Sequence, residues 1–284
     1  MSNSAFFKSS IGKKVFMALT GLFLCTFLIG HLMGNLQLIL KTGEEGRRAF
    51  NEYAYFMGHN LFIKVLSYLT YASVLIHAAD GIALTIQNRK ARPVRYAYSK
   101  PSANSSSASR SMAILGTMIL VFLATHMAHF WWNMKVKEDV PLHTYKLEMQ
   151  QPMMGANDTE IYYTHVPGVQ PIPKDKKNIV EKGTDLYIKG TNVKVAEGYR
   201  DLHGMVVDFF NKDKNENALF AVFFYVISMV VLAYHLLHGF SSAFQSLGIN
   251  HPKYTPLIKN IGVAFSILVP ALFAIIPVLI YFNH

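Results

Sequence analysis

Apolar residues are concentrated in five blocks along this chain, and the stretches between them hold most of the charged residues. A helix needs about 20 residues to cross a hydrocarbon core of about 30 Å, and every block is long enough to do so. We therefore expect an all-α integral membrane protein, a single membrane domain in which five transmembrane helices form one bundle. The predicted spans are approximately 14–40, 61–88, 111–134, 218–247 and 258–281.

The first and last blocks carry features that could argue against a membrane span. The first, VFMALTGLFLCTFLIGHLMGNLQLIL, is too long for a signal-peptide core and lacks a small-residue cleavage site, so we interpret it as a retained helix. The fifth contains Pro270 and Pro277, which should kink a membrane helix without abolishing it.

The polar segments predict the connections between the spans. Residues 41–60 are expected to form a 20-residue outer loop, and SKPSANSSSASRS a flexible inner linker. Residues 135–216 hold 12 basic and 13 acidic side chains and turn-rich pieces such as HVPGVQPIPKDKK. We expect this long extracytoplasmic loop to form an irregular cap on the bundle. Its end, GYRDLHGMVVDFF, could form a short amphipathic helix along the membrane interface.

The net charge of +10 would suggest a nucleic-acid partner in a soluble protein, but here the charge follows the membrane topology. The N-terminal segment and the connections 89–110 and 248–259 hold eleven basic residues and no acidic ones. The positive-inside rule therefore places the N-terminus in the cytoplasm and the C-terminus outside. The surplus charge predicts contact with anionic membrane lipid or an acidic partner, and no nucleic acid. The eleven residues are Lys8, Lys13, Lys14, Arg89, Lys90, Arg92, Arg95, Lys100, Arg110, Lys253 and Lys259.

Histidines inside the predicted spans point to a function, because ionisable side chains are costly in a membrane and face the bundle interior. At about 1.5 Å per helical residue, His31 and His126 lie about 15 Å and 14 Å below the outer ends of their helices. By the same measure His77 and His235 lie about 25 Å and 27 Å down. The four histidines therefore form an outer and an inner pair whose levels differ by about 10 Å.

Two histidines that face each other across a bundle can supply both axial ligands of a six-coordinate haem, an arrangement that favours electron transfer. Gly81 and Gly239 lie four residues after His77 and His235, on the same helix face, where a glycine leaves room for a flat macrocycle. The only cysteine, Cys25, permits neither a disulfide within the chain nor a C-x-x-C-H attachment site. We expect two non-covalent haems b, with His31, His126, His77 and His235 as the ligands of the haem iron.

Other residues offer alternatives. His238 could replace His235 but lacks a glycine four residues on, and His129 could replace His126 but lies shallower. Asp80 could orient a ligand, carry protons or serve only a structural role. The aromatic residues of FWW at 130–132 are most simply an interfacial belt. The remaining histidines lie in loops or at chain ends and are interpreted as ordinary: His59, His143, His165, His203, His251 and His284.

The histidine-bearing segments also resemble a known family, the cytochrome b membrane subunit of succinate:quinone oxidoreductases, in the five-helix, di-haem type that includes related fumarate reductases. In that family the first and third helices ligate the outer haem, and the second and fourth ligate the inner one. The resemblance supports the same assignment here, with the family's H-x-x-x-G pattern falling on His77 and His235. It extends over the first four spans through SSIGKKVFMALTGL, LIGHLMGN, HAADGIAL, THMAHFWWNM and YHLLHGFSSAFQSLG.

The resemblance implies a bacterial respiratory enzyme of the cytoplasmic (inner) membrane. A flavoprotein subunit would oxidise succinate at FAD, and an iron–sulfur subunit would dock on the basic cytoplasmic face and pass electrons to this chain. The haems would carry them to a membrane quinone, menaquinone in this type. This chain would hold no catalytic residue for the dicarboxylate. Ala233 stands where some fumarate reductases carry an acid, and the quinone-site residues are unassigned.

Two other functions remain open from the sequence. A di-haem cytochrome b could anchor another dehydrogenase, such as a hydrogenase or a formate dehydrogenase, and its co-purifying subunits would differ. A histidine-lined transporter or a purely structural anchor would bind no haem. Zinc and copper transport sites usually gather carboxylates or thiolates into one cluster, whereas these histidines are spread over two depths.

Overall fold

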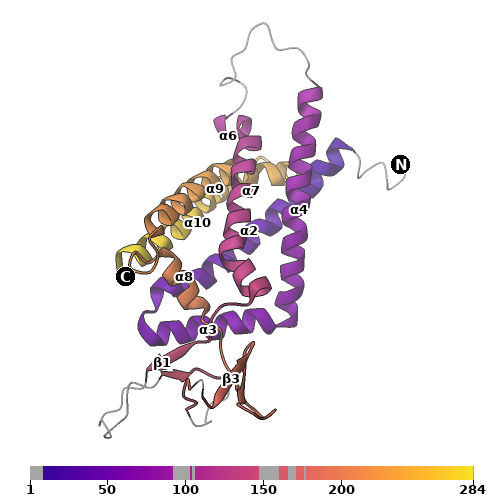
Figure 1. Cartoon of the computed structure of the whole chain (residues 1–284). Helices are drawn as coiled ribbons and strands as arrows, with labels where there is room; N and C mark the ends of the chain where they lie inside the picture. The colour runs from indigo at the N-terminus through magenta and orange to yellow at the C-terminus, as the bar shows by residue number, and fades with distance from the viewer. Residues whose placement is uncertain are drawn as a thin grey trace.

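The computed structural model of the chain describes residues 9–91, 103, 106–146, 160–165, 171–175 and 177–283. Within these residues, five helices are long and apolar enough to cross a membrane, which confirms the all-α membrane bundle, and each of them overlaps one of the predicted spans (Figure 1). They are α2 (Ser10–Leu40), α4 (Leu61–Lys90), the helix Met112–Lys137 that begins with α7 (Met112–His126), α9 (Ala218–Ser246) and α10 (Thr255–Asn283).

The third span changes its winding near its outer end. After α7 the helix continues as two π-helical turns, η1 (Met127–Trp131) and η2 (Asn133–Lys137), and stops at Glu138, whose φ is 55°. π-helical turns inside α-helices often occur at functional sites. Here the first turn begins directly after His126 and contains His129.

The predicted outer loop at 41–60 is wrong, because most of it is a helix, α3 (Gly43–His59). Glu44 and Glu45 lie in its first turn, where their negative charges complement the helix dipole. The side chain of Asn60 then accepts from the backbone N–H of Ile63 and caps the start of α4. This amphipathic helix lies across the end of the bundle (Figure 1).

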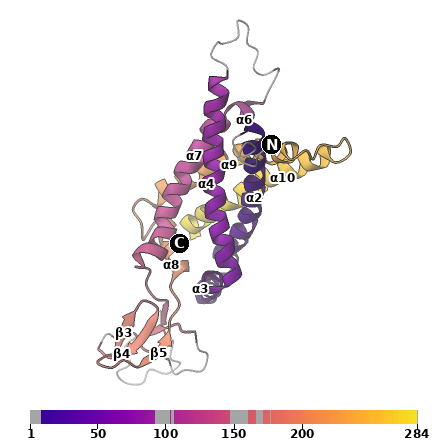
Figure 2. The same cartoon turned by 90° about the vertical axis from the view of Figure 1, so that its right-hand side faces the viewer.

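The described residues of 135–216 include five strands and a helix, so for them the prediction of an irregular cap is wrong. Two small antiparallel sheets lie beyond α3 (Figure 2), and the three-stranded one has the order β3-β4-β5. A separate core of Leu142, Tyr162, Ile172, Leu186 and Ala196 holds the cap together. The strands are β1 (Thr144–Lys146), β2 (Glu160–Tyr162), β3 (Ile179–Lys182), β4 (Asp185–Ile188) and β5 (Lys194–Glu197).

The short helix predicted at the end of the cap is present as α8 (Leu202–Phe210). Asp201 caps it by accepting from the backbone N–H of Gly204 at 3.0 Å. Its buried residues, Val207 and Phe210, join the main core, which α2, α3, α9 and α10 complete. The outer half of the bundle is therefore packed against α8 and α3.

The last two spans, α9 and α10, pack closely on each other. A Cβ added at Gly262 of α10 would lie 2.7 Å from Cδ1 of Phe240 on α9, so only glycine allows this approach. α10 stays helical through Pro270 and Pro277, both of which are buried.

The basic residues of the predicted cytoplasmic side lie at one end of the bundle. The start of α2, the end of α4, the short helix α6 (Ser107–Arg110) and the α9–α10 connection all lie at the end opposite the cap (Figures 1 and 2). Lys8, Arg92, Arg95, Lys100 and His284 lie outside the described residues, as do residues 99–102, 104 and 105 of the linker SKPSANSSSASRS.

Candidate functional site

The structure brings the two outer histidines together. The ring centroids of His31 on α2 and His126 at the end of α7 are 6.0 Å apart, with the ring planes at 88°. Two imidazoles that bind one metal ion through facing nitrogens, at about 2 Å each, have centroids about 6 Å apart. The spacing of this pair therefore fits two axial ligands of one iron.

The two inner histidines also meet. The rings of His77 on α4 and His235 on α9 have centroids 6.1 Å apart and planes at 67°. His238, one turn away on α9, is half-buried and forms no ring pair with His77 among the described residues. The two pairs thus join four helices at two levels.

The separation of the levels follows from contacts along two helices. On α2, Gly21 lies against His77 and His31 is ten residues further on, which is about 15 Å along the axis. On α9, Tyr225 lies against His126 and precedes His235 by ten residues, again about 15 Å. The value of about 10 Å from the sequence was instead a difference between depths counted from the predicted helix ends.

The two rings of the inner pair differ in their hydrogen bonds. Nδ1 of His77 lies 3.2 Å from the carbonyl oxygen of Met17 and 3.3 Å from the hydroxyl of Thr20. Donation of Nδ1–H to that carbonyl leaves Nε2 as the metal-binding atom. Nδ1 of His235 is buried and has no hydrogen-bond partner among the described residues. A buried nitrogen without a partner in the chain is consistent with a bound group at this position.

Small residues leave space around the inner rings. A Cβ added at Gly239 would meet nothing within 4 Å, and one at Gly81 would meet only Cε of Met17 at 3.9 Å. The space that the sequence predicted beside each ligand is therefore open. A third glycine, Gly21, was not predicted. A Cβ there would lie 3.2 Å from Cε1 of His77, so Gly21 makes room for the ring itself.

Aromatic rings surround the outer pair. Phe27 stacks on His31 with centroids 5.4 Å apart, and Phe273 lies 5.6 Å from the same ring. Phe130 packs on His126 at 5.4 Å and on Phe209 of α8 at 5.2 Å. The ring of Phe130 therefore packs towards the bundle interior, between the outer pair and α8.

The other candidate residues from the sequence, His129, Asp80 and Cys25, lie outside the two histidine pairs. Nδ1 of His129 lies 3.4 Å from the hydroxyl of Tyr225, beside the outer pair, and Asp80 is half-buried one turn from His77. Cys25 is buried. No three or more His, Cys, Asp or Glu side chains in the described part of the chain lie close enough to hold a metal ion together. The intramembrane histidines meet as pairs.

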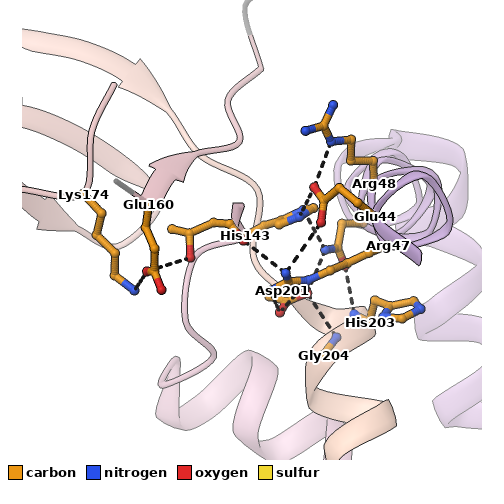
Figure 3. A network of polar contacts seen from close by, with 11 residues as sticks. Glu44, Arg47, Arg48, His143, Glu160, Lys174, Asp201, His203 and Gly204 are labelled. Carbon is orange, nitrogen blue, oxygen red and sulfur yellow. Dashed lines mark hydrogen bonds and ion pairs between the residues drawn. The ribbon is translucent and has the colours of Figure 1, made fainter. Parts of the chain in front are cut away.

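The sequence did not predict a buried polar network that lies outside the spans. Figure 3 shows Arg47 and Glu44 of α3 directed towards Asp201 and His143 of the cap. Arg47 donates to Asp201 and to the carbonyl oxygen of Thr144, and Asn51 donates to Asp201 at 2.9 Å. His143, interpreted from the sequence as an ordinary loop residue, has a fully buried side chain. The network fastens the cap and α8 to α3.

Protonation in this network is set by burial and by its hydrogen bonds. Burial alone would raise the pKa of Asp201, but hydrogen bonds from Arg47, Asn51 and the backbone of Gly204 outweigh it and hold this pKa below its ordinary value. Burial, together with the nearby positive charge of Arg47, lowers the pKa of His143. The network therefore pairs an ionised aspartate with a neutral histidine at neutral pH.

Comparison of the chain with protein-family models, curated proteins and solved structures gave no match. The function is therefore inferred from the histidine pairs, their surroundings and the charge distribution of the chain.

Proposed function

We propose that this chain is the membrane-anchor cytochrome b of a succinate dehydrogenase, which passes electrons from an iron–sulfur subunit through two haems b to a membrane quinone. One observation carries the proposal. Four different membrane helices bring four intramembrane histidines into two pairs, each with the ring spacing of two ligands to one metal ion.

The residues present fit two haems. His31 and His126 would hold the outer one, and His77 and His235 the inner one. An iron with two imidazole ligands supplies one-electron oxidation and reduction and leaves no coordination position for a substrate. The carbonyl oxygen of Met17 fixes the ring of His77, and the open space at Gly239 lies on the helix face that carries His235.

The basic end of the bundle supports a cytoplasmic docking surface for the partner subunits. Lys13, Lys14, Arg89, Lys90 and Arg110 lie there on α2, α4 and α6, at the end nearer the inner pair. An acidic face on an iron–sulfur subunit would be attracted to this surface. Electrons would then enter at the inner level and move outward by about 15 Å to the second pair. FAD and the iron–sulfur clusters belong to the partners, and menaquinone is the acceptor in this proposal.

The proposal also includes a place in the cell, the bacterial cytoplasmic membrane with the N-terminus inside. It follows from the positive-inside rule and from the resemblance of the motifs. An odd number of membrane crossings supports chain ends on opposite sides, and five helices are long and apolar enough to cross.

The test is a dithionite-reduced minus oxidised spectrum of the membrane complex purified through this chain, with haem quantified per chain. We expect two low-spin haems b. His31→Ala should remove one of them and His235→Ala the other. His251→Ala is the matched control, because His251 is exposed in the α9–α10 connection and should leave both haems in place.

The outcomes separate the competing functions. Absence of haem from the native complex would refute the proposal and favour a transporter or a structural anchor. A single haem would mean that one of the two levels is wrongly assigned. Co-purification of a flavoprotein and an iron–sulfur subunit with succinate-oxidising activity would support the succinate dehydrogenase. Hydrogenase or formate dehydrogenase subunits would instead support the alternative anchor.

A further inference from the structure

A tyrosine hydroxyl joins the outer histidine pair to a third histidine. Oη of Tyr225 on α9 lies 3.3 Å from Nδ1 of His126 and 3.4 Å from Nδ1 of His129. Tyr225 itself is buried, with 8% of its surface exposed. Because the hydroxyl has one proton and two lone pairs, it can donate to one of the two rings and accept from the other.

We propose that Tyr225 is a positioning residue for the outer haem ligand, accepting a hydrogen bond from Nδ1–H of His126 while it donates to Nδ1 of His129. This inference rests on the proposed function. A histidine that binds iron through Nε2 carries its proton on Nδ1, and the partner of that proton fixes the orientation of the ring and raises its basicity.

The direction of the chain of hydrogen bonds follows from the ring pairs. The ring of His126 faces His31 at 6.0 Å, which makes His126 the ligand and the donor. The hydroxyl proton of Tyr225 is then donated to His129, whose Nδ1 must be the acceptor. The same hydroxyl could serve His129 as the ligand only if His129, and not His126, faced His31.

The surroundings of Tyr225 strengthen these bonds by excluding water. The rings of Phe122 and Phe210 lie 5.1 Å and 5.0 Å from the tyrosine ring, and Phe209 lies 4.7 Å from the ring of His129. In such apolar surroundings a hydrogen bond is electrostatically stronger than in water, and consecutive bonds polarise one another.

The two levels therefore differ in the group that accepts a hydrogen bond from the ligand histidine. The inner His77 is held by the backbone carbonyl of Met17, whereas the outer His126 is held by a side chain. A hydrogen bond accepted from Nδ1–H makes the imidazole a stronger electron donor, which stabilises the oxidised iron and lowers the reduction potential. Tyr225 thus adjusts the potential of the outer haem alone.

The test is a redox titration of the purified complex carrying Tyr225→Phe, followed by optical and electron paramagnetic resonance spectra. We expect two haems per chain and an unchanged inner haem. At a fixed potential the reduced-to-oxidised ratio of the outer haem should rise by up to about tenfold, which is 59 mV for one electron. Its low-spin signal should also shift. Tyr281→Phe is the matched control, since it removes a hydroxyl from the outer end of α10, where the ring packs on Phe282.

A second variant keeps the test valid if Tyr225→Phe fails to assemble. His129→Leu removes the acceptor, weakens the polarisation of the hydroxyl, and should shift the outer potential in the same direction by a smaller amount. An outer haem with unchanged potential and spectrum in both variants would overturn the inference while leaving the proposed function intact. Equal changes at both haems would reduce Tyr225 to a packing residue and also overturn it. A native complex without haem would refute the proposed function itself.

Discussion

The buried polar network between the cap and α3 allows a prediction of stability, and the loss of free energy can be worked out from the contacts of Asp201. The perturbation is Asp201→Ala. It removes a buried carboxylate that accepts hydrogen bonds from Arg47, from Asn51 and from the backbone N–H of Gly204 in the first turn of α8. Loss of the helix cap costs about 1 kcal/mol. Breaking a buried ion pair costs about 3–5 kcal/mol, and the lower end applies because Arg47 is 30% exposed and keeps its bond to Thr144.

The expected loss is therefore about 3–4 kcal/mol for the opening of α8 and the cap, with allowance for overlap between the two contributions. Since 1.4 kcal/mol is a factor of ten, hydrogen–deuterium exchange of the α8 amides should accelerate by about 100-fold to 1,000-fold. Because Phe209 and Phe210 of α8 pack around Tyr225, a protein that holds the two proposed haems should lose the outer one before the inner one.

Two comparisons test the reasoning. Glu160→Ala breaks the exposed pair with Lys174, in which the side chains are 44% and 36% exposed, and should change exchange very little. A double-mutant cycle with Arg47→Ala should give a coupling energy above about 1.5 kcal/mol between Arg47 and Asp201. An Asp201→Ala variant whose exchange accelerates less than about fivefold would refute the idea that this network holds the cap.

Three further predictions concern single sites. The stability of the cap should fall as the pH drops below about 6.5, because buried His143 stays neutral when folded while the unfolded chain takes up a proton. Cap stability measured at pH 7.5 and 5.5 should show this loss, and His143→Gln should abolish it. Gly21→Val should push the ring of His77, and under the proposed function it should reduce incorporation of the inner haem only, as measured by the haem content per chain. Gly262→Val should force α9 and α10 apart and cost about 1–3 kcal/mol, seen as a lower melting temperature. Gly58→Val, on α3 with nothing within 4 Å, is the control for both valines, and a matching loss in this variant would contradict the steric argument.

The five spans could be predicted from the sequence because the bilayer imposes a local requirement. A run of about 20 apolar residues must become a helix in hydrocarbon, where no water can satisfy the backbone, and the run itself sets the bounds. The histidines stood out for the same reason, since a polar side chain within such a run needs an interior partner. The helix depths also sorted His31 with His126 and His77 with His235, and the structure brings these same rings together.

Outside the bilayer the same reasoning failed. α3 was taken for a loop because its many charged residues make its amphipathic pattern hard to recognise, with Phe50 and Asn51 buried and Glu45 and Glu52 exposed. The sheets of the cap consist of strands of only three or four residues, too short for an alternating pattern to identify them.

Only the tertiary structure shows which side chains of different elements contact one another. Tyr225 lies 99 residues from His126 in the chain, and Arg47 lies 154 residues from Asp201. Nothing in the local sequence marks such a partner, because a helix fixes the depth of a residue while packing between helices fixes what lies beside it. The sequence thus determined which residues belong to the apolar spans and how far along its span each of them lies. Packing determined which of them touch, and the hydrogen bond between Tyr225 and His126 is known only from it.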